Sequence, residues 1–304
     1  MVDINYFETD AFKGLYPFSP KNMKIGGLDY HYVDEGDGEP LVMVHGNPTW
    51  SFYFRNLIKG FSKRFRCIAP DHIGCGLSEK PSEIQYDFRL KSRVNDLEAF
   101  LDRLDVKNEI TLVLHDWGGM IGSACAVRHP ERIKRLVVLN TAAFFLPENK
   151  KLPLRLKISR NLVFFAEPAI LKFNIFALAA LHMASCKGLS KEVKKGLIAP
   201  YDSPENRIAV LKFVQDIPLV PSDPSYPTVR TTQENLFFLK DKPMLICWGM
   251  KDFVFDADFL AEWLKRFPEA EVHRFPRAGH YILEDEPEKV FACMERFLGQ
   301  RIID

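Results

Sequence analysis

Hydrophobic residues in this chain form short runs that alternate with longer stretches of helical periodicity. Seven short apolar or alternating runs, each bounded by turn residues, predict strands. They lie at Leu28–Val33, Pro40–His45, Phe65–Pro70, Glu109–Leu114, Arg135–Leu139, Pro243–Gly249 and Glu271–Phe275. The intervening stretches predict helices over Ser92–Leu104, from Gly118 through Arg128, around Phe259–Phe267 and after Pro287. Strands that alternate with helices in this way indicate a mostly parallel sheet with helices on both faces.

One long segment breaks this alternation. From about Phe144 to Phe238 no β-rich run intervenes, and Leu152–Lys195 is rich in Leu, Phe, Ala and Lys, as helices are. We therefore predict one α/β core in two parts, residues 1–144 and 239–304, with a helical cap inserted as residues 145–238. A chain of 304 residues is long enough to bury a full core. The cap is long enough to cover one edge of the sheet and enclose a pocket.

The most informative segment is Leu114-His115-Asp116-Trp117-Gly118, which joins a buried strand to a helix of small residues. A strand, a sharp turn and a helix form the nucleophile elbow, which exposes one side chain above the sheet. Aspartate here occupies the place where such a turn usually holds serine. A carboxylate can attack carbon without a base to deprotonate it, and it leaves an ester on the enzyme. Taken alone, Asp116 could equally be a solvated residue or a helix N-cap.

Two further residues could stabilise negative charge beside Asp116. The predicted strand that begins at Pro40 ends in a His-Gly-Asn-Pro loop that contains Asn47, at the edge of the sheet where ligands of open α/β sheets bind. Asn47 offers a side-chain amide, and Trp117 offers a backbone N–H and an indole N–H. Such donors suit an anionic leaving group. In the alternative interpretation, the loop is only a tight strand end and Trp117 is a packing aromatic.

An acid and a histidine follow the two last predicted strands. Asp252 comes shortly after Gly249, and His280 comes shortly after Phe275. The order nucleophile, acid, histidine is one that catalytic triads use. We assign His280 as base or proton shuttle and Asp252 as the acid that holds its tautomer. Asp256 is a rival acid, but Asp252 follows a strand directly.

Composition narrows the classes of function. The chain has 41 basic and 40 acidic residues, a net charge of +1, and nothing favours nucleic-acid binding. The six cysteines are scattered, without a C-x-x-C motif or metal-ligand spacing, so we expect neither a metal nor a cofactor. Reduced cysteines and the lack of a secretory signal predict a cytoplasmic protein. The glycine-containing segment Asp71–Pro81 is assigned a structural role rather than a catalytic one.

The cap sequence suggests an apolar pocket. Its candidate substrate contacts are Phe144, Phe145, Phe173 and Phe176, although ordinary core packing is the more common role for any one phenylalanine. The uncharged segment Phe173–Cys186 has fourteen residues, which is too short to span a bilayer. We interpret it as a helix that faces the pocket. Peripheral contact with a membrane surface is the second interpretation.

Together these motifs resemble the α/β-hydrolase superfamily over essentially the whole chain. The motifs HGNP, D-x-x-G-x-G-x-S, HDWGG, G-x-K-D and GHY, as they stand in this sequence, resemble the haloalkane dehalogenase branch. That resemblance implies that Asp116 is the nucleophile, His280 the base and Asp252 the acid. It also implies that Asn47 and Trp117 are the pair that stabilises the leaving group. A subset of the branch has its acid where this chain has Asn140, which supports Asp252.

Four longer segments are more similar to the dehalogenase-like β-lactone decarboxylases of bacterial long-chain olefin biosynthesis. These are Asn140–Phe144, Phe213–Leu219, Asp252–Asp256 and His280–Asp285. The resemblance implies conversion of a cis-3-alkyl-4-alkyl-oxetan-2-one, an apolar long-chain substrate, to a cis-alkene and carbon dioxide. It also implies an assembly with the β-lactone synthetase that makes this substrate.

Three alternatives remain open from the sequence. A haloalkane dehalogenase would use the same nucleophile and then hydrolyse the ester with water activated by His280. An epoxide hydrolase would also use an aspartate, but it needs an acid in the cap, for which Tyr201 and then Tyr226 are the candidates. A non-catalytic ligand-binding member of the fold is disfavoured, because no residue of the triad is missing.

Overall fold

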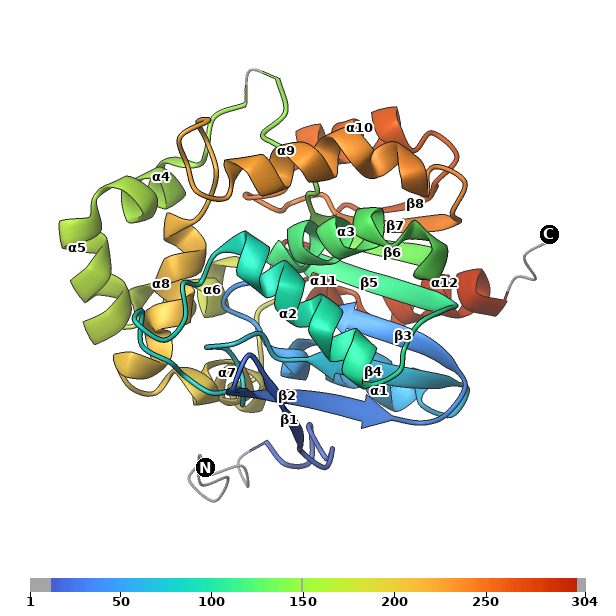
Figure 1. Ribbon diagram of the computed structural model, residues 1–304, viewed down its shortest axis with the longest axis horizontal. Helices are drawn as coiled ribbons and strands as arrows, with labels where there is room; N and C mark the ends of the chain where they lie inside the picture. The colour runs from blue at the N-terminus through green and yellow to red at the C-terminus, as the bar shows by residue number, and fades with distance from the viewer. Residues whose placement is uncertain (1–11, 149, 300–304) are drawn as a thin grey trace.

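An eight-stranded sheet forms the centre of the computed structural model, which describes residues 12–148 and 150–299 (Figure 1). The strands lie in the order β1-β2-β4-β3-β5-β6-β7-β8. Their bounds are β1 Lys21–Ile25, β2 Leu28–Glu35, β3 Glu39–Val44, β4 Phe65–Pro70, β5 Ile110–Asp116, β6 Ile133–Thr141, β7 Met244–Gly249 and β8 Glu271–Phe275. Strand β2 is antiparallel to β1 and β4, and the neighbours from β4 to β8 are parallel. The mostly parallel sheet predicted from the sequence is therefore confirmed.

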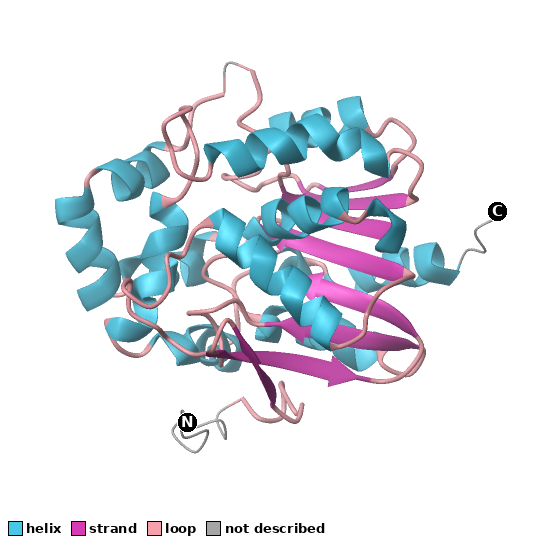
Figure 2. Ribbon diagram, viewed as in Figure 1, coloured by secondary structure: helices cyan, strands magenta, loops and turns pink. Residues whose placement is uncertain are grey.

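Helices cover both faces of the sheet, and a separate group lies at one end of the molecule (Figures 1 and 2). The helices that cover the sheet are α1 Arg55–Phe61, α2 Leu90–Arg103, α3 Trp117–Arg128, α9 Tyr226–Asn235, α10 Ala257–Arg266, α11 Ile282–Asp285 and α12 Pro287–Gly299. The group at the end consists of α4 Leu154–Asn161, α5 Val163–Glu167, the π-helix η5 Pro168–Lys172, α6 Ile175–Met183, α7 Lys191–Ile198 and α8 Ile208–Gln215. Short 3₁₀-helices complete the chain at η3 Ser51–Phe54, η4 Pro130–Arg132, η6 Ala199–Tyr201, η7 Glu205–Arg207 and η8 Leu236–Leu239.

Two hydrophobic cores lie on opposite faces of the sheet. Successive side chains of a strand point to opposite faces. In β3, Val42 and Val44 accordingly join the core under α2, α3 and α10, whereas Leu41 and Met43 join the core under α1 and α12. Because both faces of the central strands are buried, these strands appear in the sequence as continuous apolar runs.

All seven predicted strands are present, with ends that shift by at most two residues. Strand β1 and helix α1 were not predicted. Strand β1 is mostly exposed and has the polar sequence Lys-Asn-Met-Lys-Ile, so it has no apolar periodicity. Helix α1 is short and contains Gly60. No strand occurs in the described residues between β6 and β7, as the sequence indicated.

The division into residues 1–144, 145–238 and 239–304 stays a prediction. Helices α4 to α8 form the group at the end of the molecule, whereas α9 and η8, the last elements before residue 238, pack against α3 of the core.

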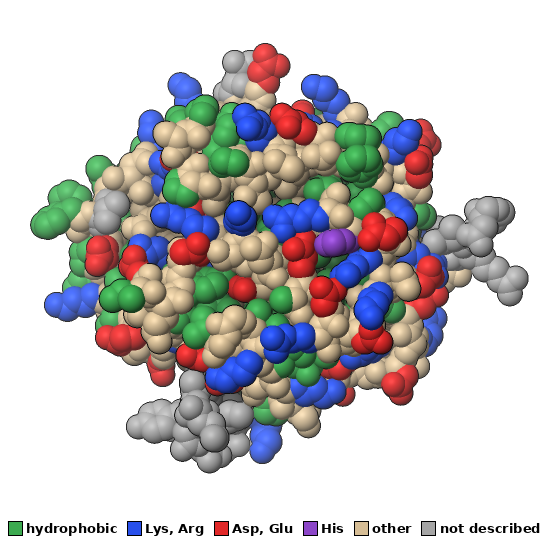
Figure 3. All heavy atoms as spheres, in the orientation of Figure 1, with side chains coloured by type: hydrophobic (Ala, Val, Ile, Leu, Met, Phe, Trp, Pro, Cys, Tyr) green, Lys and Arg blue, Asp and Glu red, His purple; other side chains and the backbone are tan. Residues whose placement is uncertain are grey.

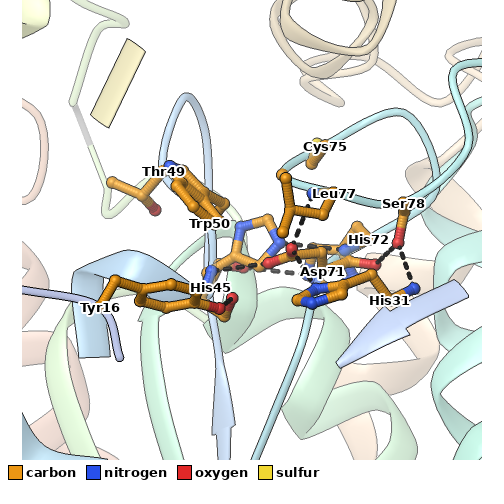
Figure 4. A network of polar contacts seen from close by, with 12 residues as sticks. Tyr16, His31, His45, Thr49, Trp50, Asp71, His72, Cys75, Leu77 and Ser78 are labelled. Atoms are coloured by element: carbon orange, nitrogen blue, oxygen red, sulfur yellow. Dashed lines mark hydrogen bonds and ion pairs between the residues drawn. The ribbon is translucent and has the colours of Figure 1, made fainter. Parts of the chain in front are cut away.

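A buried carboxylate, Asp71, fixes the loop that follows β4 (Figure 4). Its oxygens accept hydrogen bonds from the backbone N–H of Ser51 at 2.7 Å and of Leu77 at 2.9 Å, and they contact His31 Nδ1 at 2.8 Å. Burial disfavours its charge, but the His31 hydrogen bond and the other donors outweigh burial and hold the pKa of Asp71 below its usual value. The structural role predicted for Asp71–Pro81 fits this network.

The same network holds the loop that carries Asn47. His45 Nδ1 donates to the Gly46 carbonyl oxygen at 2.8 Å, and His45 Nε2 accepts the His72 backbone N–H at 3.0 Å. This pattern requires neutral His45, and burial lowers its pKa to about 4. The histidines shown in Figure 4 therefore fix the end of β3.

We expect Asp71→Ala to lower the free energy of unfolding by about 3–5 kcal/mol, because it leaves His31 and the backbone N–H groups of Ser51 and Leu77 without their acceptor. Urea denaturation measures this difference. The matched control is Asp37→Ala in an exposed turn, which should stay within about 0.5 kcal/mol of wild type. Equal stabilities of the two variants would contradict the role given to Asp71.

Candidate active site

Asp116 is the last residue of β5 and directly precedes α3. Its backbone has φ 52° and ψ −128°, in the positive-φ region that non-glycine residues rarely adopt. The Thr141 hydroxyl donates to the Asp116 carbonyl oxygen, and the Asn47 backbone N–H donates to Asp116 Oδ1 at 2.6 Å. These contacts hold the strained turn, and the carboxylate lies at the carboxyl end of the sheet.

Two glycines allow the chain to approach this turn closely. A β-carbon at Gly46 would lie 2.0 Å from Asp116 Oδ1, and one at Gly118 would lie 1.9 Å from the Val44 carbonyl oxygen. Both positions therefore exclude any larger residue while the elbow keeps this geometry. Close packing around Asp116 thus explains Gly46 of the HGNP motif and Gly118 of the HDWGG motif.

His280 and Asp252 lie beside Asp116, as predicted. His280 Nε2 is 3.6 Å from Asp116 Oδ2, and His280 Nδ1 is 2.8 Å from Asp252 Oδ2. The other oxygen of Asp252 accepts the Val254 backbone N–H at 2.7 Å. Asn140 holds the strand before this loop, since its amide bonds both the N–H and the carbonyl of Gly249. Asp116, His280 and Asp252 therefore form one connected triad of side chains.

The rival acid, Asp256, faces away from this triad. It caps α10 by accepting the Asp258 backbone N–H, and it pairs with Lys150. Its side chain is therefore engaged at the N-terminus of α10, whereas that of Asp252 contacts His280.

Burial and charge act against each other within the triad. Burial raises the pKa of Asp116, although His280 and the N–H groups of Asn47 and Trp117 favour its ionised form. Burial also opposes charge on His280, but the carboxylates of Asp252 and Asp116 outweigh it and raise the pKa of His280. The geometry thus favours an imidazolium between two carboxylates.

Asn47 and Trp117 lie at the cavity beside Asp116. One N–H of the Asn47 amide donates to the Val210 carbonyl oxygen at 3.1 Å, which fixes the amide and leaves its second N–H for a ligand. The Trp117 ring packs against Phe213, with ring centroids 5.2 Å apart. Within residues 12–148 and 150–299 the indole N–H has no hydrogen-bond partner, so it too can donate to an anion.

A cavity of about 940 Å³ lies above the triad and is lined mainly by apolar side chains. Of the predicted contacts, Phe144, Phe145 and Phe176 line it. Phe144 also packs against Trp263, and Phe145 stacks on Tyr226, so both combine a core role with a place in the cavity wall.

Phe173 does not line the cavity, which corrects the expectation for this residue. It follows η5 and its ring is largely exposed, with the Lys172 ammonium group 5.6 Å from the ring centroid. The left-handed backbone of Asn174 separates η5 from α6 here, so residues on either side of it need not share one face.

Sequence reasoning assigned no role in the site to three residues that adjoin the triad. Phe253 and Phe255 line the cavity, and Phe255 stacks against His280 with ring centroids 5.9 Å apart. His115 Nε2 lies 2.9 Å from the His280 carbonyl oxygen and supports that residue from the sheet side. Phe253 and Phe255 closely follow Asp252, and His115 directly precedes Asp116, so their sequence positions could have indicated that they lie beside the triad.

Comparison with known proteins agrees with this geometry. The family model of the α/β hydrolase fold matches residues 39–287. The chain belongs to the α/β-hydrolase fold family.

Relatives of this chain carry two different protein names. A protein of Shewanella oneidensis named cis-3-alkyl-4-alkyloxetan-2-one decarboxylase is 50% identical over 94% of this chain and 90% of its own length. A protein of that name from Xanthomonas campestris is 42% identical over 93% of this chain and 97% of its own length. Haloalkane dehalogenase 2 of Mycobacterium bovis is 34% identical over 93% of this chain and 96% of its own length.

Solved structures of haloalkane dehalogenases have the same α/β-hydrolase fold. The dehalogenase DbeA from Bradyrhizobium elkani superposes with a TM-score of 0.83 at 25% identity, over 93% of this chain and 98% of that one. A putative ancestral haloalkane dehalogenase superposes with a TM-score of 0.81 at 26% identity, over 92% of this chain and 100% of that one.

The two tyrosines considered for an epoxide-hydrolase acid lie outside the cavity of this α/β hydrolase. Tyr201 is fully buried and its hydroxyl donates to the Thr49 carbonyl oxygen at 3.2 Å. Tyr226 stacks on the far side of Phe145 and is not a lining residue. Neither is placed to protonate a ring oxygen beside Asp116.

Two further observations concern metals and membranes. No group of three or more His, Cys, Asp or Glu in the described part of the chain could hold a metal ion.

No single helix in the described residues is long and apolar enough to cross a membrane. Only Phe164–Lys172 and Ile175–Met183 together meet that length and composition, and they are bent by 74°.

We expect Asp252→Asn to reduce turnover by about 10³–10⁴-fold, because the histidine loses the carboxylate that orients it and stabilises its charge. Asp256→Asn should reduce it by less than about tenfold, since that carboxylate makes a cap and one partly exposed ion pair. Initial rates with a β-lactone and with a bromoalkane measure both. A larger loss in Asp256→Asn would identify Asp256 as the acid.

Proposed function

We propose that this α/β hydrolase is a β-lactone decarboxylase that converts a cis-3-alkyl-4-alkyl-oxetan-2-one to a cis-alkene and carbon dioxide. The proposal rests on a buried carboxylate, Asp116, that lies beside the N–H donors of Asn47 and Trp117 at a large, mainly apolar cavity. The names of the relatives at 50% and 42% identity support it.

In the first step Asp116 attacks ring carbon C4 from the side opposite the ring oxygen. The C4–O bond breaks and its electron pair stays on the ring oxygen, which gives an alkyl ester of Asp116 and a free carboxylate on C3. The N–H groups of Asn47 and Trp117 stabilise this new anion. Attack at a saturated carbon is the step that this site would share with the haloalkane dehalogenases.

In the second step the ester collapses without water. The bond between C3 and the carboxylate breaks, its electrons form the C3=C4 double bond, and the C4–O bond to Asp116 breaks. Carbon dioxide leaves and the Asp116 carboxylate is restored. Attack inverts C4 and places the Asp116 oxygen opposite the departing carboxylate. Both alkyl arms therefore stay on one side, and a cis-lactone gives a cis-alkene.

His280 acts through its charge in this scheme, because neither step consumes or releases a proton. The carboxylates of Asp252 and Asp116 raise its pKa above the usual value in spite of burial. An imidazolium 3.6 Å from Asp116 stabilises the carboxylate that leaves in the second step. Asp252 in turn stabilises the imidazolium.

The cavity fits a substrate with two alkyl arms. Its volume of about 940 Å³ is near the upper end of the range of about 300–1,000 Å³ for ligand pockets. Each methylene group transferred from water into such a wall contributes about 0.8 kcal/mol to binding. Chain length is thus recognised through apolar contact rather than through polar groups.

Haloalkane dehalogenation is the second candidate, because His280 is also placed to activate water against an ester of Asp116. Halide would then take the place of the carboxylate beside Asn47 and Trp117. The relative named haloalkane dehalogenase 2 is less similar, at 34% identity, which ranks this candidate second.

We further propose that the enzyme acts in the cytoplasm in an assembly with the synthetase that forms the β-lactone. Free cysteines support a reducing compartment: all six have unpaired thiols, and Cys67, Cys75, Cys125 and Cys247 are buried. An insoluble two-armed lactone also favours direct transfer between consecutive enzymes.

Incubation of the protein with a synthetic long-chain cis-β-lactone tests the proposed reaction. We expect cis-alkene and carbon dioxide in equal amounts. Asp116→Ala should retain less than about one hundredth of this activity, because loss of a covalent nucleophile costs several powers of ten.

A parallel incubation with a bromoalkane tests the second candidate. Rapid bromide release without lactone turnover would replace the decarboxylase by a dehalogenase. A β-hydroxy acid as the main lactone product would contradict decarboxylation.

A further inference from the structure

Eight large apolar side chains are exposed among the described residues between 154 and 178 of the cap, and five of them do not line the cavity. This cap patch consists of Leu162, Phe164, Phe165, Phe173 and Leu178, whose exposed fractions lie between 40% and 84%. Figure 3 shows hydrophobic side chains projecting at the end of the molecule where α5 lies. Exposed apolar groups of this size on neighbouring elements mark a surface that another phase or molecule covers.

The mouth of the active-site cavity adjoins the cap patch. Leu154, Ile158 and Ile175 line the cavity and are also 43–71% exposed, so they form part of its rim. Leu154 and Ile158 lie on α4, which flanks the patch. Ile175 lies on α6, which carries Leu178 of the patch. An apolar molecule could pass from the patch into the cavity along a continuous apolar surface.

The same part of the cap is strongly basic. Residues 150–172 contain six basic residues and one acidic residue, a net charge of +5, whereas the whole chain has +1. Lys151, Lys157 and Lys172 are exposed, and none of them forms an ion pair with the rest of the described structure. Apolar side chains interleaved with free lysines suit a negatively charged lipid surface.

We propose that the cap patch docks on the surface of an anionic lipid bilayer, and that the cavity takes its substrate from that bilayer. The identity of the cargo rests on the proposed function, since a lactone with two alkyl arms dissolves in lipid. The bend of 74° between the two apolar helices fits a structure that lies in the interface rather than one that spans it.

Docking would also let the substrate reach the cavity without passing through water. A molecule with two long alkyl arms leaves lipid for water at a cost of about 0.8 kcal/mol per methylene group. A cavity whose apolar rim touches the bilayer avoids that transfer. The alkene product, which has lost its polar group, can return by the same route.

Co-sedimentation with vesicles tests the docking surface. We expect the wild-type protein to bind vesicles of phosphatidylcholine mixed with phosphatidylglycerol, and to bind less to pure phosphatidylcholine or at high salt. Phe164→Ser with Phe165→Ser should lower the partition coefficient at least about tenfold, since these rings are 84% and 66% exposed and neither lines the cavity.

A matched control lies on η8, where Phe237 and Phe238 are also adjacent and exposed, by 57% and 50%. Phe237→Ser with Phe238→Ser should bind vesicles as the wild type does. Circular dichroism and turnover of a short-chain, water-soluble lactone should be unchanged in both double variants, which establishes that they are folded.

Several results would overturn the proposal. The wild type could stay in the supernatant with both kinds of vesicle, or both double variants could lose binding equally. A protein oligomer that the Phe164–Phe165 variant dissociates, without vesicle binding, would assign the patch to a protein interface instead. Vesicle binding needs no substrate, so a protein that binds vesicles but turns over only bromoalkanes would contradict the proposed function and leave docking intact.

Discussion

The strained turn at Asp116 is the constraint on which the rest of the site depends. A positive φ at a non-glycine residue is stable only when neighbouring groups hold it, and here the Asn47 backbone N–H and the Thr141 hydroxyl do so. The same Asn47 N–H also orients the carboxylate. Gly46 and Gly118 are required because the turn leaves no room for a β-carbon. The sequence motifs around the nucleophile thus follow from one backbone conformation.

The turn at Asp116 lies between two different environments. Below it, β5 is buried on both faces, and the network around Asp71 and His45 fixes the neighbouring loop. Above it, the cap closes a mainly apolar cavity that Asp116 and His280 line. Most of the cavity wall offers apolar contact, and Lys150, Lys151 and Arg155 are further charged residues that line it.

The parts of the molecule that the sequence predicted are those governed by local rules. Buried parallel strands give continuous apolar runs, and residues that follow such strands converge at one edge of the sheet, so Asp116, Asp252 and His280 could be brought together before the structure was known. Edge strand β1 lacks such a run. Residues in the cavity wall were harder to identify, because Phe173 and Phe255 look alike in sequence. The break between η5 and α6 leaves Phe173 exposed, whereas the loop between β7 and α10 places Phe255 against His280.

In the proposed reaction the ester of Asp116 collapses to an alkene without attack by water. Turnover of the lactone in ¹⁸O-labelled water, followed by mass analysis of the peptide that contains Asp116, tests it directly. We expect an unlabelled Asp116 carboxylate after many turnovers, because the C4–O bond that breaks in the second step is the one that formed in the first. A hydrolytic enzyme would direct water to the carboxyl carbon of the ester. Label that accumulates in Asp116 during lactone turnover would mean that water attacks the ester and that the decarboxylation mechanism is wrong.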